Sequence, residues 1–145
     1  MEDRFEFRDE KGLMWLIPKI NHLMRNEMEN ILKEYNISLS QWVTLARIHR
    51  MEGYNQKNLA EISLRNNAAI TRILNSLEEK GLVKRKVSPD DKREFLIYIT
   101  KKGDQLYKKS EKILFDYNND ISSIFSESEL NKLDFLLKKL FLHLK

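Results

Sequence analysis

The stretch that decides the fold runs from Asn55 to Thr100 and reads NQKNLAEISLRNNAAITRILNSLEEKGLVKRKVSPDDKREFLIYIT. Its first part has the apolar spacing of two short helices, and its last part alternates apolar and polar residues as strands do. Gly81 marks the end of the second helix, and Pro89 and Asp90 mark a turn between two strands. We therefore predict a helix, a turn, a second helix and a β-hairpin, in that order.

Caps and apolar spacing define the two helices. Asn55 can cap a helix over residues 56–63, and Asn66 or Asn67 can cap a second helix that runs to Lys80. The positions expected to face the core are Leu59, Ala60, Ile62, Ile70, Ile73, Leu74 and Leu77. The other face of the second helix shows Asn67, Ala68, Thr71, Arg72 and Asn75. A helix that follows a tight turn and exposes small and polar groups fits the major groove of DNA, so it is the candidate recognition helix.

The hairpin, called the wing below, is expected to pair residues 82–87 with residues 95–100. It carries five cations: Lys84, Arg85, Lys86, Lys92 and Arg93. The wing is a second candidate contact with DNA, because its narrow tip cannot bury these charges and phosphates attract them.

Charge is distributed unevenly along the chain. Residues 37–102 hold thirteen Lys/Arg and seven Asp/Glu, a net charge of +6, whereas residues 1–36 have a net charge of −2 and residues 103–145 a net charge of zero. A charge run is usually a solvated surface. Here the excess coincides with the two candidate contacts, which favours attraction to phosphates.

The composition limits the class of protein. A chain of 145 residues with four Gly and two Pro is expected to form one mostly helical domain. It has no cysteine, which excludes disulfides, thiolate metal sites and a cysteine nucleophile. The charged residues 1–12 do not resemble a signal peptide, and no apolar run approaches the about 18 residues of a membrane span. We expect a cytoplasmic protein that does not enter a membrane.

Longer helices are expected before the central stretch. An apolar stripe from Leu13 to Tyr35 predicts an N-terminal helix, irregular before Pro18 and continuous from there to Tyr35. Ser38 and Gln41 form a capping box for the next helix, which Gly53 should end.

Two more helices are expected after the wing. Thr100 can cap a helix from about Lys101 to Ser123, and Ser126 and Glu129 form a capping box for a last helix. The last helix is expected to bury Leu130, Leu133, Leu137, Leu140, Phe141 and Leu144, and it also shows Phe135, Leu136 and Leu142. A helix that is apolar nearly all round needs a partner surface, and the simplest partner is a second copy of the chain.

The sequence shows no pattern typical of catalysis. His22, His49 and His143 lack the spacing of a metal site and are interpreted as surface or interface residues. Asp90 and Asp91 lie at a hairpin tip between basic residues, where a turn with local ion pairs is expected. There is no phosphate-binding glycine loop and no nucleophile motif. We expect a protein that is not an enzyme and uses no metal or cofactor.

Five short motifs in register resemble the MarR-type winged helix-turn-helix transcription regulators. They are Leu59-Ala60, Thr71-Arg72, Lys80-Gly81-Leu82-Val83, Asp91-Lys92-Arg93 and Thr100-Lys101-Lys102-Gly103. Each motif alone is weak, but the five together, with Ser38, Gln41 and Trp42 before them, are specific. The resemblance extends over nearly the whole chain. It implies a fold that is mainly α with a small β-hairpin wing, in which residues 37–100 form the DNA-binding lobe and residues 10–36 and 101–145 form dimerisation helices.

The resemblance also implies a function and a set of site residues. The expected function is sequence-specific binding of double-stranded DNA as a homodimer on a pseudo-palindromic operator, as a repressor released by a small aromatic or anionic effector. The expected DNA contacts are Gln56, Lys57, Asn66, Asn67, Ala68, Ala69, Thr71, Arg72, Asn75, Lys84, Arg85, Lys86, Asp91, Lys92 and Arg93. The resemblance further suggests that Arg93 enters the minor groove and that an ion pair with Asp91 holds it in place.

Departures from the family pattern leave two alternatives open. Ala68 and Ala69 stand where many members have hydroxylated residues, and Leu64 stands where a glycine is common in the turn. Ala can still touch a thymine methyl, so the change indicates a different operator or more backbone contacts. The alternatives are a winged-helix protein that acts by binding another protein, and a nonspecific basic DNA binder.

Overall fold

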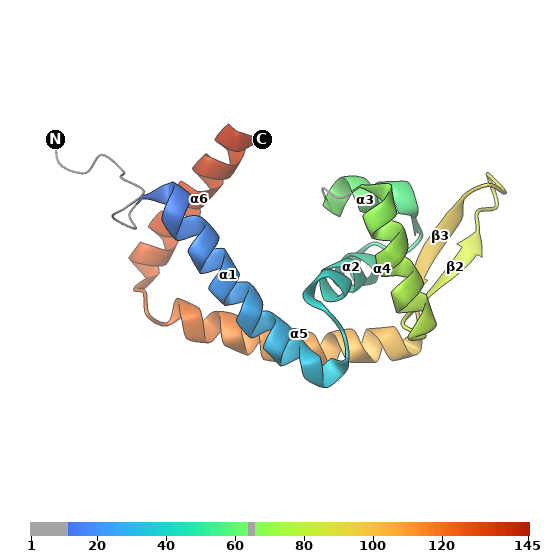
Figure 1. Cartoon of the computed structure of the whole chain (residues 1–145), viewed down its shortest axis with the longest axis horizontal. Helices are drawn as coiled ribbons and strands as arrows, with labels where there is room; N and C mark the ends of the chain where they lie inside the picture. The colour runs from blue at the N-terminus through green and yellow to red at the C-terminus, as the bar shows by residue number, and fades with distance from the viewer. Residues whose placement is uncertain (1–11, 64–65) are drawn as a thin grey trace. The chain divides into compact units, whose positions relative to one another are not determined.

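The computed structural model describes residues 12–63 and 66–145. The elements are α1 (Leu13–Leu32), the 3₁₀ turn η2 (Lys33–Tyr35), α2 (Leu39–Arg50), β1 (Tyr54–Asn55), α3 (Gln56–Ser63), α4 (Asn67–Glu79), β2 (Val83–Val87), β3 (Phe95–Ile99), α5 (Lys101–Ser122) and α6 (Glu127–Leu144) (Figure 1). The predicted fold class, mainly helical with a small sheet, is confirmed. None of the described helices is long and apolar enough to cross a bilayer. The chain divides into two compact units after Ser110, within α5.

The sheet has one strand more than predicted. Strands β2 and β3 form the antiparallel wing, with Arg85 opposite Ile97 and Val87 opposite Phe95. The short strand β1 pairs with the other edge of β3 and gives the strand order β1-β3-β2. Two residues carry no periodicity, so β1 could not be recognised in the sequence.

The core of the first unit lies where α2, α3, α4 and the sheet meet. Its side chains are apolar and almost fully buried, and they include Leu32, Leu45, Ile48, Leu59, Ile70, Leu74, Leu77, Leu82 and Ile97. The predicted inward positions of α3 and α4 are thus largely confirmed. Two positions differ: Ile62 lies in the last turn of α3 and is 37% exposed, and Ile73 of α4 is only half-buried.

The predicted caps hold the helices where expected. The Ser38 hydroxyl accepts a hydrogen bond from the Gln41 N–H at 3.1 Å while the Gln41 side chain accepts one from the Ser38 N–H, which completes the capping box of α2. Asn66 caps α4 by accepting from the Ala69 N–H at 2.8 Å. Ser126 and Glu129 form the second predicted box, at the start of α6.

The prediction for the N-terminal helix was wrong at both ends. Helix α1 begins at Leu13, continues through Pro18 and ends at Leu32, after which η2 leads to Asn36 in the left-handed region. Pro18 removes only one N–H, the donor to the carbonyl of Met14, at the start of a 20-residue helix. That single loss is small beside the bonds that the remaining turns form.

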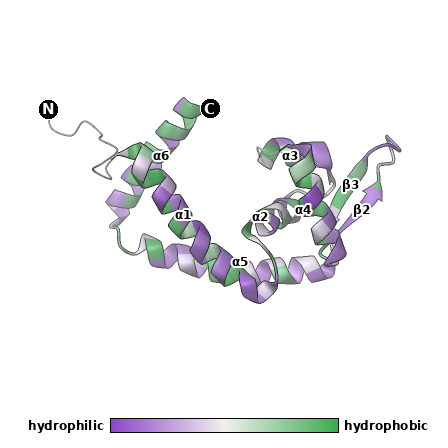
Figure 2. Cartoon of the chain, viewed as in Figure 1, coloured by the Kyte–Doolittle hydropathy of each residue, from purple (hydrophilic) through white to green (hydrophobic). Residues whose placement is uncertain are grey.

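Helix α6 does not bury its apolar side chains within the chain. Leu130 and Leu140 are half-buried, and Leu133, Leu137, Phe141 and Leu144 are exposed, which corrects the expectation that all six are covered. Apolar residues recur along the whole helix (Figure 2). Four of the six predicted positions are therefore exposed to solvent in the single chain.

Candidate nucleic-acid interface

The candidate recognition helix α4 presents a polar outer face because its inner face fills the core. Ile70, Leu74 and Leu77 are completely buried. Their spacing leaves Asn66, Asn67, Ala68, Arg72 and Asn75 exposed and Ala69 half-buried. Arg72 is the exposed cation in the middle of this surface.

Thr71 is occupied by contacts within the protein. Its hydroxyl donates to the carbonyl of Asn67 at 2.8 Å and accepts a hydrogen bond from the Gln56 side-chain amide at 2.5 Å. The structure thus brings together two residues that were predicted separately as DNA contacts, and they bind each other across α3 and α4. The Thr71 hydroxyl proton is therefore used within the protein and is not available to a base edge.

The wing tip is organised by backbone hydrogen bonds. The buried Ser88 hydroxyl accepts from the N–H groups of Asp90 and Asp91, and the Ser88 N–H donates to the carbonyl of Glu94 at 2.9 Å. The Asp91 carboxylate accepts from the Arg93 N–H at 2.9 Å. Among the described residues no ion pair joins Asp91 to the Arg93 guanidinium, so a contact with the Arg93 backbone replaces the predicted ion pair.

The five wing cations do not share one surface. Lys84 and Lys86 are exposed on one face of β2, and Lys86 lies 5.0 Å from the centre of the Tyr98 ring. Arg85 lies on the other face, which packs on the helices. Lys92 and Arg93 are exposed at the tip. Only the tip pair combines exposure with a position beyond the paired strands.

An open cleft of about 350 Å³ lies between the starts of α3 and α4 and the wing tip. It is lined by Asn55, Gln56, Lys57, Asn67, Arg93, Glu94 and Phe95. The Asn55 amide donates to the Glu94 carboxylate at 3.2 Å, which ties the wing to the strand that precedes α3. Four predicted DNA contacts therefore line one cleft. Asn55, Glu94 and Phe95 were missed because their place depends on β1, which the sequence did not reveal.

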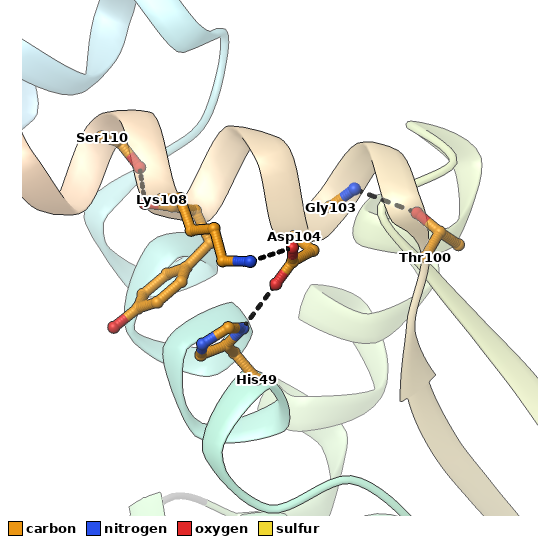
Figure 3. A network of polar contacts seen from close by, with 7 residues as sticks. His49, Thr100, Gly103, Asp104, Lys108 and Ser110 are labelled. Carbon is orange, nitrogen blue, oxygen red and sulfur yellow. Dashed lines mark hydrogen bonds and ion pairs between the residues drawn. The ribbon is translucent and has the colours of Figure 1, made fainter.

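A polar network connects α2 to the first half of α5 (Figure 3). The His49 Nδ1 lies 2.9 Å from the Asp104 carboxylate, which also accepts from Lys108 Nζ at 2.7 Å. The hydrogen bond from Lys108 is the main reason that the pKa of Asp104 lies below its ordinary value; partial desolvation opposes it, and the Lys108 charge and His49 add to it. The Thr100 hydroxyl accepts from the Gly103 N–H and caps α5, as predicted.

A second cleft, of about 320 Å³, lies on α2 and is lined by Trp42, Val43, Ala46, Arg47, Arg50, Met51 and Ile62. The Trp42 indole N–H donates to the Ser110 hydroxyl at 2.8 Å, and Arg47 donates to the carbonyl of Ile62 at 2.9 Å. The cleft combines an aromatic wall with two cations. Within residues 12–63 and 66–145, no group of three or more His, Asp and Glu side chains could hold a metal ion.

Comparisons with known proteins agree with this geometry. Residues 37–95 match the model of the MarR family. A protein of Thauera aromatica, named as a transcriptional regulatory protein for the hcr operon, is 34% identical over 89 residues, which cover 61% of this chain. Those residues span 54% of the Thauera protein, so the match extends over about half its length.

Solved structures show the same fold. The MepR–DNA complex of S. aureus has a TM-score of 0.88 at 24% identity and covers 92% of this chain and 98% of its own. A mutant MarR from E. coli complexed with operator DNA has a TM-score of 0.85 at 25% identity and covers 94% of this chain and 99% of its own. Residues 37–95, which hold the helix-turn-helix and most of the wing, thus form a MarR-family domain, and the chain as a whole has the winged-helix fold of these structures.

Proposed function

We propose that this protein is a transcriptional regulator that binds double-stranded DNA as a homodimer on a pseudo-palindromic operator. The observation that carries the proposal is the surface formed by α4 and the wing tip, where Arg72, Lys92 and Arg93 are exposed. It agrees with the net charge of +6 in residues 37–102 and with the DNA complexes among the structural relatives. We infer that it acts by binding, as a repressor in the cytoplasm, and catalyses no reaction.

Base reading in this proposal depends on few side chains. Ala68 and Ala69 offer no donor, and the Thr71 hydroxyl is bonded within the protein. Asn67 and Arg72 are left as the polar groups able to reach base edges, and Arg72 suits guanine O6 and N7. The small number of base-reading groups makes a nonspecific DNA binder the second candidate function. It is favoured over a winged-helix protein that binds another protein instead of DNA, because the exposed cations remain.

The test measures the affinity of wild type and of Arg72→Ala for two kinds of DNA. One is genomic fragments selected by their binding to the wild-type protein, and the other is random duplex of equal length. If Arg72 reads a guanine, Arg72→Ala costs about 1 to 3 kcal/mol on the operator and much less on random duplex. Equal affinity of wild type for both duplexes would support the nonspecific binder, and no binding at low salt would refute both. Circular dichroism of the variant controls for folding.

Dimerisation is supported by the uncovered apolar side chains of α6. Phe141 is 56% exposed and Leu144 is 75% exposed, which is costly for large apolar groups in water. A second copy would cover them and would place two recognition helices on two half-sites, as a palindromic operator requires.

The cleft on α2 supports a small aromatic or anionic effector. Trp42 can stack on an aromatic ring, and Arg47 and Arg50 can attract a carboxylate. Salicylate is the probe: it should raise the melting temperature and weaken operator binding at millimolar concentration, less so in Arg50→Ala. If neither quantity changes in wild type, a phenolic effector is excluded.

A further inference from the structure

Arg85 occupies the helix-facing side of the wing. In strand β2 it lies between Val83 and Val87 on one face, and its partner across the ladder is the buried Ile97. Lys84 and Lys86, its neighbours, point to the other face and are exposed. Its side chain is only 21% exposed, which is unlike the cations at the tip.

Both ends of the Arg85 guanidinium are bound to the recognition helix. Nη1 lies 2.5 Å from the Glu78 carboxylate, and Nη2 donates to the Asn75 side-chain oxygen at 2.8 Å. A planar fork that donates to two groups one helical turn apart fixes both distance and orientation. The ammonium of a lysine cannot reproduce this pair of contacts, because it is a single point of charge.

We propose that Arg85 is a positioning residue that clamps the wing to the recognition helix and does not itself contact DNA. The inference rests on the proposed function and changes the role that the sequence assigned to Arg85. The clamp sets where the tip cations lie relative to Arg72. The clamp also orients the Asn75 side chain. The Asn75 oxygen accepts from Arg85, so the Asn75 amide N–H groups are left for acceptors such as guanine O6 or thymine O4.

The charge balance supports a clamp over a phosphate contact. If Arg85 turned to a phosphate, Glu78 would lose the cation that neutralises it and would be left unpaired on the helix that is proposed to face DNA. Such a carboxylate would repel phosphates. With the clamp closed the pair is neutral, and the positive charge offered to DNA comes from Arg72 and the wing tip.

The first experiment needs no DNA. Arg85→Lys keeps the charge and removes the fork, so the amides of residues 84–96 should exchange hydrogen at least about threefold faster than in wild type, with α2 amides unchanged. Lys84→Ala, on the same strand but the other face, should leave these rates as in wild type. Unchanged exchange in Arg85→Lys overturns the clamp whatever the protein binds.

The second experiment measures duplex binding by Arg85→Lys, Glu78→Gln and the double variant. Each single change should weaken binding about three- to tenfold, and the double variant should bind like either single one, because both remove the same contact. Hydroxyl-radical protection at the wing's minor groove should fall, while protection of guanine N7 from methylation in the major groove beside α4 remains, which general destabilisation would not produce. Tighter binding by Glu78→Gln, or wild-type binding by Arg85→Lys, would overturn the clamp. If Arg85→Lys shows the faster exchange but the wild-type protein binds no duplex, the proposed function is refuted and the clamp is retained.

Discussion

Replacing Gly103 by alanine is predicted to disrupt the packing of α5 against the wing strands. A Cβ placed there would lie 2.1 Å from the Leu82 carbonyl oxygen and 2.9 Å from Ile99 Cγ1. The first contact is with backbone, so a side-chain rotation cannot relieve it. The same carbonyl accepts the Thr100 N–H at 3.0 Å, and a shift of Leu82 would weaken that bond too.

The cost of Gly103→Ala follows from these contacts. Overpacking against a fixed neighbour costs about 3 kcal/mol at the upper end of its usual range. Weakening the Thr100 hydrogen bond adds about 1 kcal/mol. Alanine is the better helix former and returns about 1 kcal/mol. The net expectation is a loss of about 3 kcal/mol in the free energy of unfolding.

Urea denaturation followed by circular dichroism measures this loss. Lys101→Ala is the matched control, because Lys101 is exposed in the same turn and its replacement should change stability by less than about 0.5 kcal/mol. A Gly103→Ala protein as stable as wild type, or more stable, would show that helix propensity dominates and that the close approach to Leu82 is not tight.

Three further outcomes are expected. Asp91→Ala should weaken duplex binding, because the carboxylate holds the Arg93 backbone; tighter binding in salt titrations would mean that Asp91 merely repels DNA. Because the folded pKa of Asp104 is lowered, its contribution to stability is present above the ordinary carboxyl pKa and is lost as pH falls through the lowered value. The stability difference between wild type and Asp104→Asn, from urea melts, should therefore shrink in acid, and a constant difference would contradict the Lys108 and His49 contacts. Sedimentation at micromolar concentration should show a dimer, and truncation before Ser126 should give monomer or insoluble protein; a monomeric full-length chain would contradict dimerisation.

Local signals explain which parts of the fold could be predicted. The caps at Ser38, Asn66 and Ser126 and the apolar spacing of α4 act within a few residues, so the sequence alone was sufficient for them. Strand β1 forms only because β3 offers a free edge, and no local pattern records that. Pro18 indicates the start of a helix by local rules, yet α1 begins five residues earlier and continues through it.

The candidate site was predictable as a set of residues but not as an arrangement. Alternation in β2 already separates Arg85 from Lys84 and Lys86, but only the packing of β2 on α4 shows which face meets Glu78. Likewise the exposed face of α4 follows from its period, whereas the bond between Thr71 and Gln56 depends on how α3 and α4 are packed. Contacts between elements are decided by tertiary structure, which a single sequence does not display.

The bond between Gln56 and Thr71 has a consequence for attempts to redirect this protein to new operators. A replacement at Thr71 leaves the Gln56 amide without its acceptor, and a replacement at Gln56 leaves the Thr71 hydroxyl bonded only to the carbonyl of Asn67. The effects of substitutions at the two positions on DNA affinity will therefore not be additive. A library that varies α4 alone will test each replacement of Thr71 beside a Gln56 that has lost its acceptor. Under the proposed function, Gln56 and Thr71 therefore have to be varied jointly when the DNA specificity is engineered.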